Sequence, residues 1–129
     1  MRIEHVAVYV SNLEKMRSFY CQYFGGTSNQ GYENPISGLK TYFLSFSDGS
    51  RLELMKRPDV ISGTNHELQL GLCHLAFDVG CREQVDHLTK EIKEDGYTVF
   101  AQPRITGDGY YESVILDPEG NRIEITSNP

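Results

Sequence analysis

The sequence has few cysteines, and none of them has a partner at a spacing typical of disulfides or metal clusters. The three are Cys21, Cys73 and Cys81, an odd number in a chain of 129 residues. We therefore expect free thiols in a reducing compartment, which favours a cytoplasmic protein. A chain of this length buries enough surface to fold without disulfides.

Long hydrophobic runs and excess positive charge are also absent. No stretch of 18 apolar residues occurs, and residues 1–9 alternate like a strand instead of forming the apolar core of a signal peptide. Acidic residues outnumber basic ones by 18 to 12, which gives a net charge of -6. An acidic surface repels phosphate backbones, so we do not expect nucleic acid as a partner. Without a long apolar run, we also expect no membrane partner.

One segment occurs twice in the sequence. HVAVYV at 5–10 matches HLAFDV at 74–79, an offset of 69 residues. A helix-like stretch follows each copy, because apolar residues recur at helical spacing over 13–23 and again over 85–92. A repeat of this kind predicts two copies of one supersecondary module.

Signals at the ends of the two helices agree with this repeat. Ser11 and Glu14 are spaced as a capping box before the first helix. Gly25 with Gly26 and, in the second copy, Gly96 follow the last apolar residue of each helix. We expect the helices to end at these glycines, where the backbone can take a positive φ.

Two strands around a turn close each module. Their predicted ranges are 41–46 and 51–55 in the first module, then 110–116 and 121–126 in the second. The turns contain Asp-Gly and Asp-Pro-Glu-Gly, which are turn sequences because glycine accepts positive φ and proline fixes its own. Tyr42 and Tyr111 keep the offset of 69, whereas the glutamates after the turns are offset by 71, so we expect about two extra residues near the second turn.

A further extended stretch at 97–101 adds a strand to the second module. The sequence therefore predicts an α+β fold of two tandem βαβββ modules. They cover 1–58 and 70–126 of a single domain, 1–129, and a surface linker that contains Pro58 joins them.

Strand alternation places four ionisable residues on one kind of surface. The apolar side chains of each first strand must face the helices, so His5 and His74 point away from them. The last strand of each module places Glu53 and Glu124 in the same way. Taken singly, each residue fits a solvated strand position or a local hydrogen bond. Together, two His and two Glu at equivalent places favour a divalent metal site.

These residues resemble the vicinal oxygen chelate superfamily, which includes glyoxalase I, bleomycin-resistance proteins and extradiol dioxygenases. The resemblance covers 1–126. Four motifs carry it: His5-x-Ala-x-x-Val, Arg51-Leu-Glu53-Leu, His74-Leu-Ala-Phe and Asp117-Pro-Glu-Gly-Asn-Arg-Ile-Glu124. It implies a glyoxalase-like fold in which the curved mixed sheets of two βαβββ modules enclose a metal-bearing cavity.

Ligand identity separates the activities of this superfamily. Short bacterial glyoxalase I carries the metal ligands His, Glu, His and Glu, the set that His5, Glu53, His74 and Glu124 offer. The dioxygenases and thiol transferases of the superfamily typically use two His and one Glu. The resemblance implies one divalent ion per site, with zinc or nickel ahead of cobalt, manganese or iron. It also implies a homodimer whose sites take two ligands from each chain; a closed monomer with paired modules is the alternative.

The implied activity is that of a metal-dependent isomerase or lyase, similar to lactoylglutathione lyase. A small hemithioacetal or vicinal-oxygen substrate would react through a metal-stabilised enediolate. By resemblance Glu124 is the leading catalytic base, and Glu53 is the opposite ligand or a second base. The alternatives are a dioxygenase or thiol transferase of the same superfamily, or a non-catalytic binding protein of the bleomycin-resistance type.

Six further residues are candidate substrate contacts: Tyr9, Tyr42, Arg57, Arg104, Tyr111 and Glu112. Tyr9 stands where short glyoxalases carry a basic residue that helps to hold the glycyl carboxylate of glutathione. Arg57 stands where they carry an asparagine, and it is a candidate for supplying the missing charge. The expected small-molecule partner is thus a glutathione adduct or another thiol adduct.

Three residues are assigned structural positions instead. Cys73 precedes His74 and is predicted to be a small buried residue on the opposite face. His87 is predicted to be solvated on the polar side of the second helix. His66 is expected in an exposed loop of the linker.

Overall fold

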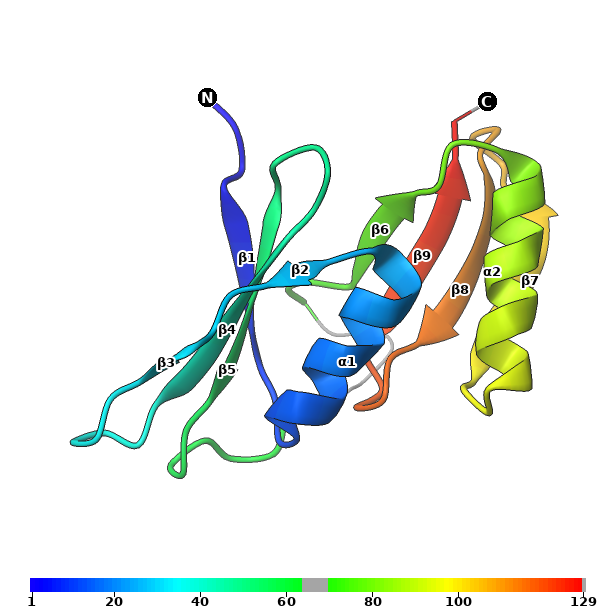
Figure 1. Cartoon of the computed structure of the whole chain (residues 1–129). Helices are drawn as coiled ribbons and strands as arrows, with labels where there is room; N and C mark the ends of the chain where they lie inside the picture. The colour runs from blue at the N-terminus through cyan, green and yellow to red at the C-terminus, as the bar shows by residue number, and fades with distance from the viewer. Residues whose placement is uncertain (64–69, 129) are drawn as a thin grey trace. The chain divides into compact units, whose positions relative to one another are not determined.

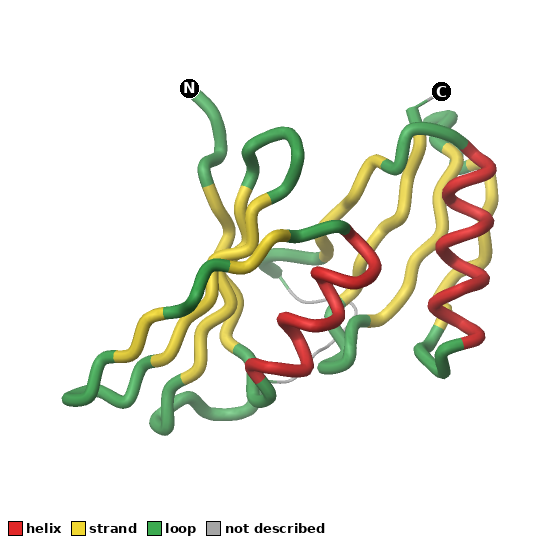
Figure 2. The backbone as a smooth tube through the Cα atoms, viewed as in Figure 1, coloured by secondary structure: helices red, strands yellow, loops and turns green. Residues whose placement is uncertain are grey.

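The computed structural model describes residues 1–63 and 70–128 (Figure 1). The chain divides into two compact units, with the boundary after Gly63. The described part of each unit contains one helix and one mixed sheet (Figure 2). The α+β fold with two tandem modules, predicted from the internal repeat, is therefore confirmed.

The first unit places one helix against a five-stranded sheet. Its elements are β1 (His5–Tyr9), α1 (Leu13–Phe24), β2 (Thr27–Ser28), β3 (Tyr32–Glu33), β4 (Lys40–Ser45) and β5 (Arg51–Lys56). The strands run in the order β1-β5-β4-β2, and β3 also pairs with β4. Among the described strands of the first unit, β1 and β5 pair in parallel and the other pairs are antiparallel. The sequence did not locate β2 and β3, which are two residues long.

Helix α1 begins one residue later than the capping box predicts. Asn12, not Ser11, is the N-cap, and its side chain accepts a hydrogen bond from the Lys15 backbone N at 3.1 Å. Asparagine caps a helix as well as serine does, so two adjacent cap formers leave the start ambiguous by one residue. The predicted end is confirmed, because Gly25 is the C-cap and has a φ of 68°.

The core of the first unit is rich in aromatic side chains. Phe19 and Tyr20 of α1 are buried, and their rings meet edge to face with centroids 5.3 Å apart. They pack on the sheet face that carries the fully buried Leu44 and Leu54. This face is the one that strand alternation assigns to the helix.

The second unit repeats this arrangement. Its elements are β6 (His74–Asp78), α2 (Arg82–Glu94), β7 (Val99–Ile105), β8 (Tyr111–Leu116) and β9 (Arg122–Ser127). The order is β6-β9-β8-β7, and the β6–β9 pair is parallel. The strand predicted at 97–101 begins two residues later and extends to Ile105. The other predicted strands match within one residue.

The core of the second unit is aliphatic and includes a pair of hydroxyl groups. Val85 and Ile92 of α2 are fully buried. Thr89 lies between them, and its Oγ1 contacts the Val85 carbonyl oxygen and the Ser113 Oγ, each at 2.6 Å. Leu88, one of the apolar residues at helical spacing over 85–92, is only half-buried. The predicted helical spacing is thus correct, but Thr89 is buried where an apolar residue is expected, because its hydroxyl has two hydrogen-bond partners.

The strand register corrects the predicted place of the two extra residues. Ser45 pairs with Arg51 in the first hairpin and Leu116 pairs with Arg122 in the second, so the residues that flank the turn are six positions apart in both. The turns therefore have equal length, and the two residues are gained before the second hairpin. Tyr42 corresponds in register to Ser113, not to Tyr111.

The three structural assignments have different outcomes. The prediction for Cys73 was wrong, because its side chain is exposed. It precedes β6 and lies outside the strand ladder, so alternation does not decide its burial. His87 is exposed on α2 as predicted, and His66 lies outside the described residues. Among the described residues, no helix combines the length and the apolar character needed to cross a bilayer.

Candidate metal centre

The parallel strand pair of each unit brings one histidine and one glutamate to the same face. In the first unit Ala7 of β1 pairs with Glu53 of β5, and His5 lies two residues before Ala7 on the same side of the strand. In the second unit Ala76 pairs with Glu124, and His74 again lies two residues earlier. Both pairs lie on the face opposite the helix, as alternation predicts.

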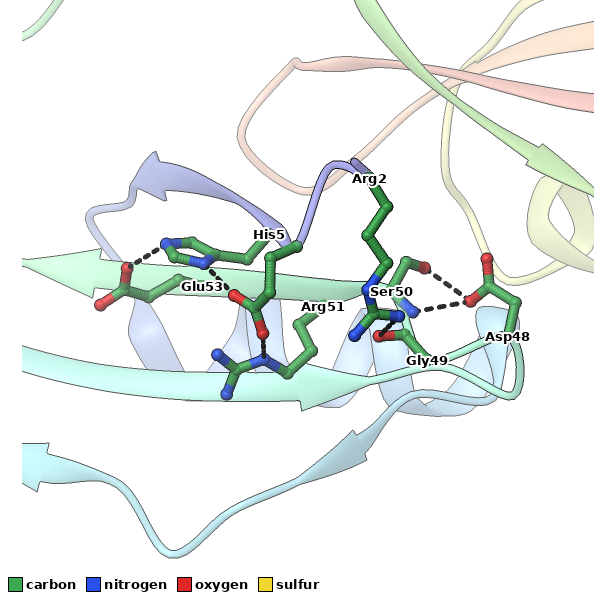
Figure 3. A network of polar contacts seen from close by, with 8 residues as sticks. Arg2, His5, Asp48, Gly49, Ser50, Arg51 and Glu53 are labelled. Atoms are coloured by element: carbon green, nitrogen blue, oxygen red, sulfur yellow. Dashed lines mark hydrogen bonds and ion pairs between the residues drawn. The ribbon is translucent and has the colours of Figure 1, made fainter.

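Within each unit the two side chains point toward one another. His5 Nε2 lies 3.7 Å from Glu53 Oε2 (Figure 3). The corresponding distance in the second unit, from His74 Nε2 to Glu124 Oε2, is 3.2 Å. The glutamate side chains are only 15% and 19% exposed, and the histidines 39% and 37%. Each pair thus combines a shielded carboxylate with a more accessible imidazole.

The donor atoms of both pairs fit a divalent first-row ion. Imidazole nitrogen and carboxylate oxygen are ligands that zinc and its neighbours accept. Both N···O distances are shorter than the sum of a Zn–N and a Zn–O bond, which is about 4 Å. No group of three or more His, Cys, Asp or Glu side chains suited to a metal occurs among the described residues. Each pair is therefore half of a usual four-ligand set.

A polar network surrounds the His5 ring. His5 Nδ1 hydrogen-bonds to Glu4 Oε2, and Glu4 Oε1 accepts a hydrogen bond from Arg51 Nε at 2.6 Å. These two hydrogen bonds, led by that of Arg51, lower the pKa of Glu4 to about 2. The Arg51 guanidinium also stacks over the Phe43 ring, 4.2 Å from its centroid, and this ring meets His5 edge to face.

The surroundings of His74 differ. Cys73 occupies the position of Glu4, and Arg122, in the register position of Arg51, stacks over Phe100 at 4.1 Å. Within the part of the chain that the structure describes, the contact with Glu124 is the one hydrogen bond or ion pair of the His74 ring. The two histidines thus occupy equivalent positions, but only the His5 ring contacts a second carboxylate, that of Glu4.

Glu112 and Arg104 lie on the same face as Glu124. Arg104 Nη2 is 3.6 Å from Glu112 Oε1. The Glu112 side chain is 13% exposed, and this burial, followed by the negative charge of Glu124, raises its pKa. These two predicted substrate contacts therefore form a polar cluster beside the second His–Glu pair.

Tyr42 and Tyr111 are brought to the opposite face, where they tie a strand to a helix. The Tyr42 hydroxyl donates to Glu14 Oε1 at 2.6 Å, and Arg17 lies 4.3 Å from the ring centroid. The Tyr111 hydroxyl donates to Asp86 Oδ1, also at 2.6 Å. Each hydrogen bond raises the pKa of its tyrosine. The structure does not group either residue with the His–Glu pairs.

Tyr9 and Arg57 lie at the far end of the first unit's strands. Tyr9 shares the face of His5 and Glu53, and it is 51% exposed. Arg57 forms a two-pronged ion pair with Asp59, with N···O distances of 2.8 and 2.7 Å. Since Asp59 already neutralises this guanidinium, a substrate carboxylate would have to compete with it.

The sequence-based reasoning missed Glu4, Arg51 and Phe43 as neighbours of His5. A carboxylate directly before a strand histidine is a readable signal, because the two side chains can turn toward one another at the strand end. The internal repeat does not mark Glu4, because Cys73 stands at this position in the second copy.

Comparison with known proteins identifies the family. The family model for the Glyoxalase/Bleomycin resistance protein/Dioxygenase superfamily matches residues 2–125. The chain belongs to this superfamily. An uncharacterized protein of Bacillus subtilis, YqjT, is 27% identical over 97% of this chain and 98% of its own.

Solved structures of superfamily members share the fold. A glyoxalase family protein from Enterococcus faecalis has a TM-score of 0.80 and 24% identity, and covers 98% of this chain and 97% of its own. Glyoxalase I from Zea mays has a TM-score of 0.80 and 22% identity over 98% of this chain. The match spans 44% of the maize chain, so this chain has less than half its length. At these identities the likeness shows a common fold.

Proposed function

We propose that the protein is a divalent-metal-dependent isomerase or lyase of the glyoxalase I type, acting on a small hemithioacetal or vicinal-oxygen substrate. One observation carries the proposal: both units place a histidine nitrogen within 4 Å of a glutamate oxygen, at the same place on the same face. A bleomycin-resistance type of binding protein has no need for two such pairs. Superfamily membership supports the proposal, since members commonly bind divalent metals.

The proposed metal ligands are His5, Glu53, His74 and Glu124. Each unit supplies two donors, and two donors do not complete a protein metal site. The two pairs therefore act together, either across a homodimer or within one chain. Four protein ligands of this hardness suit zinc or nickel, and cobalt, manganese and iron accept the same set.

The proposed chemistry moves one proton between neighbouring carbons. A bound divalent ion would act as a Lewis acid for the negative charge that develops on the substrate oxygen. Glu124 removes the proton from the carbon that bears the hydroxyl and returns it to the former carbonyl carbon, while the hydroxyl proton passes from one oxygen to the other, so the reaction has no net change in atoms. Ala76 and Val114 pair with Glu124 on the two neighbouring strands. Neither of these apolar side chains can donate a hydrogen bond to the carboxylate.

The remaining residues on the ligand faces are proposed to bind the substrate. Tyr9, Arg104 and Glu112 stay as candidate contacts because each shares a face with a His–Glu pair. Arg57 stays a weaker candidate because Asp59 engages its guanidinium. A thiol adduct that lacks the glycyl carboxylate of glutathione would not need Arg57 at all.

The test is hemithioacetal isomerisation by protein that has been stripped of metal and reloaded separately with nickel, zinc, cobalt, manganese or ferrous iron. The substrate is formed from methylglyoxal and glutathione, and in a second series from methylglyoxal and a small thiol. Metal content is measured in the same samples. Glu124→Gln is compared with Glu94→Gln, an exposed carboxylate at the end of α2 that pairs with Lys90.

The proposal expects turnover that requires metal, is retained in Glu94→Gln and falls by about two to four orders of magnitude in Glu124→Gln. Turnover of the small-thiol adduct but not of the glutathione adduct would support the proposed chemistry and exclude glutathione as the thiol part of the substrate. Full metal occupancy without turnover on either adduct would contradict the proposed activity. Equal activity with and without metal would contradict the role of the His–Glu pairs.

A further inference from the structure

We propose that Glu4 is a positioning residue for the metal ligand His5, which it holds in the ring orientation and tautomer that leave Nε2 free to bind a cation. This inference rests on the proposed function, because it concerns a ligand of the proposed metal site. It adds a residue that acts through His5 and does not itself touch the ion. It also predicts that a neighbouring carboxylate fixes the tautomer and ring orientation of His5 but not of His74.

The contacts of the Glu4 carboxylate define its role. One oxygen, Oε2, contacts Nδ1 of His5, and the other, Oε1, accepts the hydrogen bond from Arg51 Nε at 2.6 Å. Figure 3 shows the His5 ring with a contact from each nitrogen, one of them to Glu53. The carboxylate is thus a bridge between the guanidinium and the side of the imidazole that faces away from Glu53.

The chemistry of these groups sets the tautomer. A carboxylate only accepts hydrogen bonds, so the nitrogen that contacts Glu4 must carry the proton. In the neutral ring the proton is then on Nδ1, and Nε2 keeps its lone pair. That lone pair faces Glu53 Oε2, another acceptor, at 3.7 Å. Two acceptors that face one another repel, and a cation between them removes the repulsion.

Arg51 keeps the carboxylate in place. It pairs with His5 in the strand register, and its backbone N donates to the Glu4 carbonyl oxygen at 3.2 Å. Its guanidinium lies 4.2 Å from the centroid of Phe43, whose ring also meets His5 edge to face at 5.4 Å. Phe43 thus contacts both Arg51 and His5, and Arg51 holds one oxygen of the Glu4 carboxylate while the other contacts the ring.

The second unit supplies an internal comparison. Cys73 precedes His74 just as Glu4 precedes His5, and a thiol is at most a weak partner for a ring nitrogen. Arg122 stacks over Phe100, a residue of β7, at 4.1 Å. Within residues 1–63 and 70–128, the His74 ring contacts no carboxylate other than that of its ion-pair partner Glu124. Only His5 therefore has the carboxylate support that metal-bound histidines commonly have.

Two measurements test the inference, and the first needs no metal. Long-range ¹H–¹⁵N spectra of the imidazole groups report which ring nitrogen carries the proton. They are recorded on the metal-free full chain at about pH 9, where an ordinary imidazole is neutral. The His5 signals are assigned by their loss in His5→Ala. Wild type is compared with Glu4→Ala and with Cys73→Ala, the matched change before His74.

We expect the Nδ1–H form of His5 in wild type and in Cys73→Ala, and a mixture or the Nε2–H form in Glu4→Ala. The Nε2–H form in wild type would overturn the inference, and so would an unchanged Nδ1–H form in Glu4→Ala. A residue that only stabilises the fold would not change the tautomer. Glu4 is about half exposed, so its replacement by alanine leaves the core intact.

The second measurement is calorimetric titration of the same proteins with zinc. Loss of a carboxylate that supports a ligand histidine typically weakens metal binding about 10- to 100-fold. We expect this loss in Glu4→Ala and less than about a twofold change in Cys73→Ala. Equal affinity of Glu4→Ala and wild type would overturn the inference. Wild type that binds no zinc would instead contradict the proposed function, while the tautomer still decides whether Glu4 orients His5.

Discussion

The two units share a topology but differ in what surrounds the histidine at equivalent places. In the first unit, Glu4 and Arg51 hold one side of the His5 ring. In the second, Cys73 takes the place of Glu4 and Arg122 stacks on a different strand. The cores differ as well, since aromatic rings fill the first and a threonine–serine pair lies within the second.

This difference shows which features the repeat requires. The parallel strand pair, with a histidine and a glutamate on the face opposite the helix, is the same in both units. The side chains behind this face and the polar groups at the strand ends vary. We infer that the His–Glu pair is the element common to both units that the proposed function needs, and that its supporting residues are particular to each unit.

The largest expected effect separates the two glutamates. At saturating metal, Glu124→Gln should lower kcat by about two to four orders of magnitude, because it removes the proposed base. Glu53→Gln should mainly weaken metal binding, so that added metal restores much of the activity. The measurement is kcat for hemithioacetal isomerisation as a function of metal concentration. A greater loss of kcat in Glu53→Gln than in Glu124→Gln would reverse the assignment of roles.

The next effect concerns the cores behind the two faces. Leu54 and Ile125 follow Glu53 and Glu124 directly, point to the helix side and are fully buried. Leu54→Ala and Ile125→Ala should each lower the free energy of unfolding by about 2–5 kcal/mol, because each leaves a cavity. Denaturant unfolding measures this, with the exposed Ile36→Ala as the control. A loss below about 1 kcal/mol at either site would show that this unit's core relaxes around the change.

A smaller effect compares the starts of the two helices. Asn12 caps α1 through its side chain, whereas Cys81, the N-cap of α2, makes no side-chain cap hydrogen bond. Asn12→Ala should lower the free energy of unfolding by about 1 kcal/mol. Cys81→Ser should raise it by a few tenths to about 1 kcal/mol, because the extended backbone at this position suits a capping hydroxyl. Destabilisation by Cys81→Ser in thermal unfolding would show that the thiol makes a contact worth more than the cap.

The smallest effect is a pH dependence of the two tyrosine contacts. The pKa values of Tyr42 and Tyr111 are raised above 10.0 because each neutral hydroxyl donates to a carboxylate. The stabilisation is therefore present below pH 10 and is lost as pH rises through the folded-state pKa. Tyr42→Phe and Tyr111→Phe should each be less stable than wild type near neutral pH, and the difference should shrink above pH 10. A difference that grows with pH would contradict this sign.

The fold was largely predictable from the sequence, because its signals are local and occur twice. The alternation around His5 and His74, the helical spacing after each and the glycine at the end of α1 all agree with the structure. The register of the second hairpin was not predictable to the residue. An offset of 69 or 71 depends on where the two extra residues lie, and only the pairing of Leu116 with Arg122 decides this.

The candidate site was predictable as two pairs, and the structure adds what surrounds them. Alternation places all four residues on the strand faces opposite the helices, and the parallel strand register then brings each histidine within 4 Å of its glutamate. The hydroxyls of Tyr42 and Tyr111 donate hydrogen bonds to helix carboxylates, and no strand pattern reveals these partners. The adjacency of Glu4 and His5 makes their contact possible, but side-chain torsions at the strand end decide whether it forms, and these come from the structure.

The most direct test of the central claim, that the two His–Glu pairs act together on one ion, is calorimetric zinc titration of metal-free wild type, His5→Ala and His74→Ala. We expect one ion per chain in wild type and a large loss of affinity in both variants, although the substituted residues belong to different units. Absence of zinc binding in wild type, or a loss confined to one variant, would contradict the claim.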